Sequence, residues 1–168
     1  MELILYISKK QNKNENSLTL TALIEMIMEN GETEIAITMD VNVVLDFVNA
    51  INSSDVDRIY GLMTENHLFI DSQDNRMNGK ENMKQAWTAY FAMFPDYKIE
   101  INEIVEKDSL ICILGYASGT YKGMKKENNS NYWRIPAAWT AVVLDDKIKQ
   151  WQVYADNLIV ADIINRNK

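Results

Sequence analysis

Apolar residues recur with two different periodicities along this chain, and the periodicity changes near residue 96. Before that point they recur mostly three or four positions apart, which is the spacing of one buried helix face. After it they recur mostly at every second position, as in strands with one buried face. Helices first and a run of strands afterwards is an order typical of the α+β class.

Three helices are predicted between residues 40 and 94. The inner face of the first consists of Val44, Phe47, Val48 and Ile51. A turn and cap signal at 53–55 precedes a second, short helix with apolar positions Val56, Ile59, Tyr60 and Met63. The third and clearest helix runs from Lys80 to Phe94 and is ended by Pro95. Its buried stripe consists of Met83, Ala86, Trp87, Tyr90, Phe91 and Phe94.

The strands are predicted from alternation and from the turn residues between them. The first is His67–Asp71, and the polar segment 72–79 after it reads as a loop. Later strands are predicted from Tyr97 with a bulge at 104–105, from Leu110 to Tyr121, from Tyr132 to Val143 and from Ile148 to Asn157. Glycines inside the second of these later strands indicate bending or a close neighbouring backbone. A short tail helix is predicted over 158–164.

The first 38 residues differ in character from the rest. Apolar residues between Leu18 and Met28 recur at helical spacing, and Gly31 is a plausible stop. We therefore expect an N-terminal extension, 1–38, with one helix, and a single domain over 39–168.

Charge and cysteine content exclude several classes of function. The formal net charge is −7 and no basic patch is present, which argues against nucleic-acid binding. No apolar stretch approaches the ~20 residues of a membrane span. The single cysteine, Cys112, makes a disulfide within the chain impossible, which fits a cytoplasmic protein. One histidine, one cysteine and no clustered ligands predict no metal site, and no cofactor fingerprint is present.

Four segments, in this order and spacing, resemble the SnoaL-like branch of the nuclear transport factor 2 superfamily, which includes the ketosteroid isomerases. They are Phe47–Asp55, His67–Asp71, Trp87–Tyr97 and Trp151–Asn157, and the resemblance covers about residues 40 to 160. It implies a cystatin-like cone, in which helices pack on a strongly curved antiparallel sheet around a pocket. It also implies a dimer, often through the sheet. Aromatic and β-branched residues on both faces of the last strands likewise favour a homodimer.

Asp71 is the first candidate for chemistry. In the resemblance it falls where ketosteroid isomerases carry their general base, although an aspartate here can equally cap the loop that begins at Ser72. Alternation puts His67, Phe69 and Asp71 on one strand face. His67 lies about 13 Å along the strand from Asp71, so the two cannot form a direct dyad but can flank one ligand. A histidine that simply bonds to the backbone is the alternative.

Asp156 is the second acid–base candidate, because relatives can place an acid near this position in the pocket. Alternation puts it on one face with Gln152 and Tyr154, and leaves open which face looks inward. A cap for the tail helix is its alternative role. The remaining ligand-binding candidates are the aromatic residues Phe47, Phe69, Trp87, Tyr90, Trp133, Trp139 and Tyr154. For Trp87 a core role is favoured, and of Trp133 and Trp139 we expect one in the pocket and the other in the core or an interface.

At several positions this sequence lacks residues that enzymes of the resembling family need, and this limits the reactions that it can catalyse. The ketosteroid isomerase tyrosine appears as Phe47, and the strand from Tyr132 to Val143 carries no carboxylate for an oxyanion hole. The strand Leu110 to Tyr121 lacks the arginine and acids that epoxide hydrolase relatives need. We therefore expect a cofactor-free isomerase- or cyclase-type enzyme acting on a small hydrophobic metabolite. The alternative is a non-catalytic ligand-binding or dimerisation module of the same fold.

Overall fold

The computed structural model describes residues 39–123 and 131–167, so the predicted N-terminal extension lies outside the described residues. A helix over 39–52 comes first. It is followed by α3 (Val56–Gly61), β1 (Met63–Ile70), β2 (Arg76–Asn78), α4 (Lys80–Met93), β3 (Lys98–Lys107), β4 (Leu110–Thr120), β5 (Tyr132–Leu144), β6 (Lys147–Ala155) and α5 (Leu158–Arg166). None of these helices is long and apolar enough to cross a membrane.

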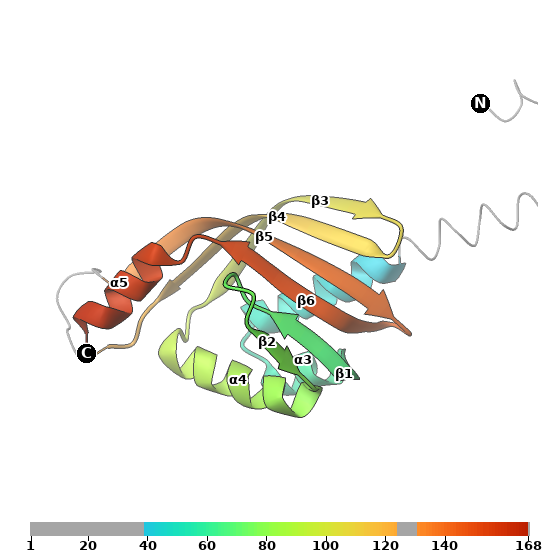
Figure 1. Ribbon diagram of the computed structural model, residues 1–168, viewed down its shortest axis with the longest axis horizontal. Coiled ribbons are helices and arrows are strands. Elements are labelled where there is room, and N and C mark those ends of the chain that lie inside the picture. Colours follow the sequence, from blue (N-terminus) through green and yellow to red (C-terminus); the bar gives the residue numbers. More distant parts are fainter. Residues whose placement is uncertain (1–38, 124–130, 168) are drawn as a thin grey trace, which may run out of the picture. The chain divides into compact units, whose positions relative to one another are not determined.

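The six strands form one curved sheet in the order β2-β1-β6-β5-β4-β3. Neighbouring strands are antiparallel except β1 and β6, which run parallel. The sheet arches over the helix 39–52 and α4, which lie on its concave side (Figure 1). This arrangement confirms the predicted α+β class with a curved sheet on N-terminal helices.

Predicted and observed elements differ mainly around β1. The cap signal is confirmed, because the Asp55 side chain accepts a hydrogen bond from the Arg58 backbone N–H at 3.0 Å. The second helix ends at Gly61, however, and Met63 already belongs to β1. The predicted loop 72–79 contains the short strand β2, which pairs with β1 after a tight turn closed by an Asp71 N–H to Asn75 carbonyl bond of 3.1 Å. Asparagine and aspartate are common in such turns. Because the segment 72–79 is rich in them, its composition predicted a loop and gave no sign of the strand.

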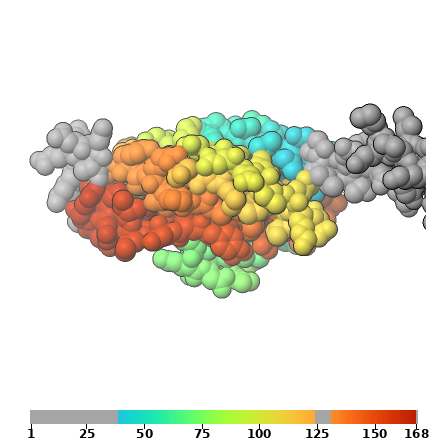
Figure 2. All heavy atoms as spheres, turned by 90° about the horizontal axis from the view of Figure 1, so that it is seen from above, coloured from blue at the N-terminus to red at the C-terminus, as the bar shows by residue number. Residues whose placement is uncertain are grey.

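The inner face of β5 shows how alternation builds the core. Its buried residues are Trp133, Ile135, Ala137, Trp139, Ala141 and Val143. On the other face of the sheet, Val105, Leu114 and Tyr154 are 47%, 40% and 48% exposed. Figure 2 looks onto this outer face, where side chains of β3 to β6 (yellow to red) lie open to the viewer. The homodimer stays a prediction, for which this face is the natural surface.

Candidate functional site

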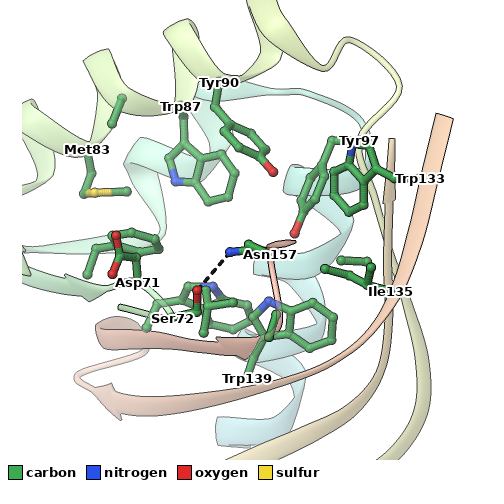
Figure 3. Close-up of a pocket in the computed structure, with 16 residues that line it drawn as sticks. Asp71, Ser72, Met83, Trp87, Tyr90, Tyr97, Trp133, Ile135, Trp139 and Asn157 are labelled. Carbon is green, nitrogen blue, oxygen red and sulfur yellow. Dashed lines mark hydrogen bonds between the residues drawn. The ribbon is translucent and has the colours of Figure 1, made fainter. Parts of the chain in front are cut away.

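A cavity of about 320 Å³ opens between α4 and the concave face of the sheet (Figure 3). Its wall is largely aromatic and aliphatic. The lining residues are Phe69, Asp71, Ser72, Met83, Ala86, Trp87, Tyr90, Tyr97, Ala117, Trp133, Ile135, Trp139, Trp151, Val153, Ala155 and Asn157. A concave, mostly apolar space with a few polar groups is the general form of a small-molecule site.

The two periodicities of the sequence bring these side chains together. Trp87 and Tyr90 come from the buried stripe of α4, whose helical spacing turns both toward the sheet. Trp133 and Trp139 are six residues apart on β5, so both point to the same, inner face. Both line the cavity, whereas we expected only one of them there.

The strand β6 presents its odd-numbered residues to the cavity. Trp151, Val153 and Ala155 line it, and Asn157 continues the series just beyond the strand. The opposite face carries Tyr154, which is half exposed. The structure thereby resolves the orientation of the last strand, which alternation had left open.

The aromatic rings of the wall pack on one another. Trp87 stacks on Phe91 with ring centroids 5.2 Å apart. Tyr90 and Tyr97 meet edge to face at 5.0 Å, and Trp133 packs against Tyr97 at 6.1 Å. Edge-to-face and offset contacts of this kind add specific geometry to the burial of the rings. The cavity is therefore lined by rings that support one another.

The hydroxyls of Tyr90 and Tyr97 are polar groups inside this wall. Figure 3 shows both pointing into the open space. Burial, together with the neighbouring Tyr97, raises the pKa of Tyr90 well above its usual value. Burial also raises the pKa of Tyr97, although the nearby Trp139 indole N–H works in the opposite direction without reaching hydrogen-bond geometry. Both tyrosines therefore stay protonated in the physiological range.

Asp71 lines the cavity and also caps the turn after β1. Its Oδ1 accepts hydrogen bonds from the backbone N–H groups of Gln73 (2.8 Å) and Asn75 (2.9 Å), and its Oδ2 accepts one from Asn75 Nδ2 (2.8 Å). Partial burial acts to raise the pKa of Asp71, but these three hydrogen bonds outweigh it and hold the pKa below its usual value. The carboxylate is consequently ionised at neutral pH. Asp71 therefore caps the loop, as one of the two predicted alternatives has it, and it also lines the cavity. The other alternative, a general base, stays a prediction.

A side-chain hydrogen bond joins two chain segments beside Asp71. The Asn157 Nδ2 donates to the Ser72 Oγ at 2.9 Å, linking the turn after β1 to the end of β6 (Figure 3). Both residues line the cavity. This contact fixes the distance between the two strand ends that carry Asp71 and Ala155.

His67 lies outside the cavity wall and is fully buried. Its Nδ1 donates to the Ile148 carbonyl at 2.8 Å, since a carbonyl can only accept, and the Phe47 ring packs nearby with centroids 6.3 Å apart. The Nε2 atom has no hydrogen-bond partner among the described residues. This geometry matches the alternative given for His67, a histidine that forms a hydrogen bond to the backbone.

The burial of His67 predicts a pH-dependent stability. Burial lowers the pKa of His67, and the bond to Ile148 opposes this only in part. As the pH falls below about 6.5, His67 is protonated in the unfolded chain but stays neutral in the folded chain. Stability should be full above about pH 6.5 and fall below it, by up to about 1.4 kcal/mol per pH unit until the folded-state pKa is reached. Urea unfolding of wild type and His67→Gln at about pH 7.5 and about pH 5.5 checks this. An equal loss in both proteins would contradict it.

The other predicted site residues lie away from the cavity. Phe47 is buried in the core and packs on Trp151 at 5.2 Å. Asp156 is exposed, and its Oδ1 accepts a hydrogen bond from the Leu158 backbone N–H at 3.0 Å, at the start of α5. Together with the outward Tyr154, these residues line no part of the cavity.

Sequence reasoning missed several lining residues, of which Tyr97 and Trp151 are the largest. Tyr97 was predicted as the first residue of a strand and ends one of the segments that carry the resemblance, but its position three residues after Phe94 gave no sign that it faces Tyr90. Trp151 lies on one face of the last strand, and alternation did not show whether that face points inward. Within the described residues no group of three or more acidic, histidine or cysteine side chains is placed to hold a metal ion.

Comparison with protein families matches residues 44–151 to the SnoaL-like domain, which is more than half of this chain. Among curated proteins, a probable translation initiation factor of Thermoplasma volcanium is 24% identical over 153 residues. The match covers 81% of this chain, but the chain spans only 26% of that protein's length.

Many solved structures share the fold. A protein from Xanthomonas campestris described as a polyketide cyclase superposes with a TM-score of 0.67 at 14% identity, covering 76% of this chain and 98% of that one. A SnoaL-like polyketide cyclase from Jannaschia gives 0.65 at 17% identity, covering 76% and 92%. An epoxide hydrolase from M. tuberculosis gives 0.64 at 14%, covering 79% and 93%. At these identities the likeness establishes the fold alone.

Proposed function

Because this chain belongs to the SnoaL-like domain family, we propose that it is a cofactor-free acid–base enzyme. Its substrate is a small hydrophobic metabolite held in the aromatic cavity, and Asp71 takes a proton from a substrate carbon. The reaction is of the isomerase or cyclase type. The observation that carries this proposal is the ionised Asp71 carboxylate on the wall of a cavity that is largely aromatic and aliphatic.

The hydrogen bonds of Asp71 define what kind of base it is. They keep its pKa low, so the carboxylate is always available at neutral pH but is a weak base. A weak base suits a substrate whose C–H bond is already acidic, such as a carbon next to a carbonyl group. The Oδ2 atom accepts one hydrogen bond and keeps a lone pair for the incoming proton.

Hydrogen–deuterium exchange tests the proposal directly. 2-Tetralone is a flat bicyclic ketone with acidic α-hydrogens, and its deuteration in D₂O is followed by NMR. We expect the wild type to accelerate exchange and Asp71→Asn to lose about 10²-fold of that rate, which is the usual contribution of a positioned base. The rate should not change between about pH 5 and pH 8, because the pKa of Asp71 lies below this range.

Asp74→Asn is the matched control, since Asp74 lies in the same turn, is exposed and does not line the cavity. It should exchange the probe at the wild-type rate. Equal rates for wild type and Asp71→Asn, with the ketone bound in both, would rule out Asp71 as the base.

The second candidate function is ligand binding without catalysis. The saturation of Asp71 Oδ1 by two backbone N–H groups favours it, because those bonds hold the side chain as a structural cap. The described cavity wall also contains no second acid and no histidine, so Asp71 alone would have to take the proton and return it. Under this function the ketone binds, and its α-hydrogens exchange no faster than in buffer.

A further inference from the structure

Every tryptophan of this chain lines the same cavity. The four residues are Trp87, Trp133, Trp139 and Trp151. Further phenylalanine and tyrosine rings complete the aromatic part of the wall. The face of an aromatic ring carries partial negative charge, and indole attracts a cation more strongly than the other side-chain rings do. A wall that gathers all the indole rings of the protein therefore favours a ligand with a positive charge.

The charge of the wall has the sign that such a ligand needs. Among the described residues that line the cavity, Asp71 is the one acid, and there is no lysine, arginine or histidine to pair with it. Its Oδ2 accepts one hydrogen bond, from Asn75, and keeps a lone pair that faces no protein cation. The net charge of −7 adds a field that attracts cations to the whole chain. A cationic ligand would neutralise Asp71, whereas an anionic ligand would add an unpaired charge to the cavity.

The supply of hydrogen-bond acceptors restricts the kind of cation. A primary ammonium group has three N–H donors, each of which needs an acceptor once it leaves water. Asp71 Oδ1 already accepts from two backbone N–H groups, and Ser72 Oγ already accepts from Asn157. A quaternary ammonium group has no N–H donors, and its methyl groups bring the positive charge against ring faces. The wall therefore suits an alkylated cation better than a primary amine.

The indole N–H groups favour a competing chemistry, a ligand that accepts hydrogen bonds. Those of Trp87, Trp133 and Trp139 have no hydrogen-bond partner within the described residues. An anionic acceptor would meet the Asp71 carboxylate in a wall without a cation, and its transfer from water would be strongly unfavourable. The two chemistries require ligands of opposite charge, so probes that differ only in charge separate them.

We propose that the cavity binds a quaternary ammonium compound with a compact hydrocarbon body, whose positive head lies between Asp71 and the indole rings. This inference rests on the proposed function, because it assigns the substrate class of the same cavity. In a space of about 320 Å³, a trimethylammonium head contacts several rings of the wall at once. Figure 3 shows Asp71 across the open space from Tyr97 and Trp133, so the hydrocarbon body extends from the carboxylate toward those rings.

Three probes of one shape and three charges test the proposal: benzyltrimethylammonium, its uncharged carbon analogue neopentylbenzene, and the phenylmethanesulfonate anion. Dissociation constants are measured by equilibrium dialysis. The decisive quantity, the selectivity ratio, is the dissociation constant of neopentylbenzene divided by that of benzyltrimethylammonium. We expect a ratio of about ten in the wild type, with the sulfonate binding more weakly than either of the other probes. Benzylammonium, the primary amine, should bind more weakly than benzyltrimethylammonium.

Asp71→Asn tests the carboxylate. It should lower the selectivity ratio about fivefold, because a partly exposed ion pair contributes about that much, and it should leave neopentylbenzene binding unchanged. Asp74→Asn is the matched control, since it removes the same charge from an exposed position of the same turn that does not line the cavity. Its selectivity ratio should equal that of the wild type.

Fluorinated tryptophan tests the rings without truncating them. Since all four tryptophans line the cavity, biosynthetic replacement by 5-fluorotryptophan or 5,7-difluorotryptophan alters indole rings at this site alone. Fluorine withdraws electron density from the ring face and so weakens its attraction for a cation. The selectivity ratio should fall in two steps, by about twofold and then by about fivefold. Unchanged binding of neopentylbenzene shows that the labelled cavity is intact.

A selectivity ratio of one or less in the wild type would overturn the proposal. So would a ratio that neither Asp71→Asn nor fluorination lowers, tighter binding of the sulfonate or of benzylammonium, or failure of every probe to bind. These outcomes are independent of the exchange of 2-tetralone. Cation selectivity without Asp71-dependent exchange rejects catalysis and keeps the ammonium site, whereas exchange without cation selectivity rejects the ammonium site alone.

Discussion

Gly115→Ala should lower the free energy of unfolding by about 3 kcal/mol, as severe overpacking does. An added Cβ at this position would lie 1.9 Å from the backbone carbonyl oxygen of Glu100. A backbone atom cannot move aside as a flexible side chain can, so β3 and β4 would have to separate. The register between these strands shifts close by, between Ile101 and Glu103, and the bulge brings the two backbones together at Gly115. Urea denaturation measures the change.

Gly61→Ala is the control for this prediction. Gly61 ends α3, and nothing lies within 4 Å of the position its Cβ would take. Alanine there should leave the stability unchanged or raise it by about 0.5 kcal/mol, because it restricts the unfolded chain. Equal stability of the two variants would contradict the close approach of β3 to β4.

The same strand pair shows how much of the fold is visible in the sequence. Glycine inside the alternating segment 110–121 predicted a close neighbouring backbone, and Gly115 has one. A bulge in β3 was predicted at 104–105, two to three residues after its actual place between Ile101 and Glu103. Alternation reports which side chains are apolar, but a bulge is set by backbone pairing with a partner strand that the pattern does not name.

The strand β1 shows what alternation leaves undecided about the site. His67, Phe69 and Asp71 share one parity, yet Phe69 and Asp71 line the cavity and His67 does not. The pairing of β1 with β6 shifts between Met63 and Leu68, which pair with Ile148 and Gln150 respectively. His67 lies inside this irregular stretch and bonds to the Ile148 carbonyl. The ring of His67 is buried beside Phe47 in the core. Alternation predicts which face a side chain takes, but it does not predict how far along the strand the cavity extends.

Helical spacing predicted which aromatic side chains of α4 are buried better than it predicted which of them line the cavity. Trp87 belongs to the core stripe of α4 as predicted, and it also lines the cavity, since one large ring can serve both. Tyr90 was predicted as a ligand-binding residue, and it lines the cavity. Its partner Tyr97 could not be, because the bend between α4 and β3 brings it back toward Tyr90. The cavity is thus a product of tertiary packing that no single segment encodes.

Trp139→Ala should lower the free energy of unfolding by about 3 to 5 kcal/mol, the range for truncation of a large buried aromatic residue. Trp139 is 0% exposed and lies at the centre of the sheet, in register with Ile113 on β4 and Val153 on β6. Its indole N–H has no hydrogen-bond partner within the described residues, so the loss comes from packing. For a domain of this size the melting temperature should fall by about 10 °C.

Because Trp139 also lines the cavity, the same variant should gain a ligand. Its removal enlarges a space that is already apolar, and free indole can fill the room that the side chain leaves. Indole at about 100 times its dissociation constant should restore about 2.7 kcal/mol to the variant and much less to the wild type. Tyr154→Ala, two positions from Asp156 on the outward face of β6, serves as the control, with a loss of about 1 kcal/mol or less and no rescue. The prediction would be contradicted if Trp139→Ala lost little unfolding free energy, or if indole stabilised all three proteins equally.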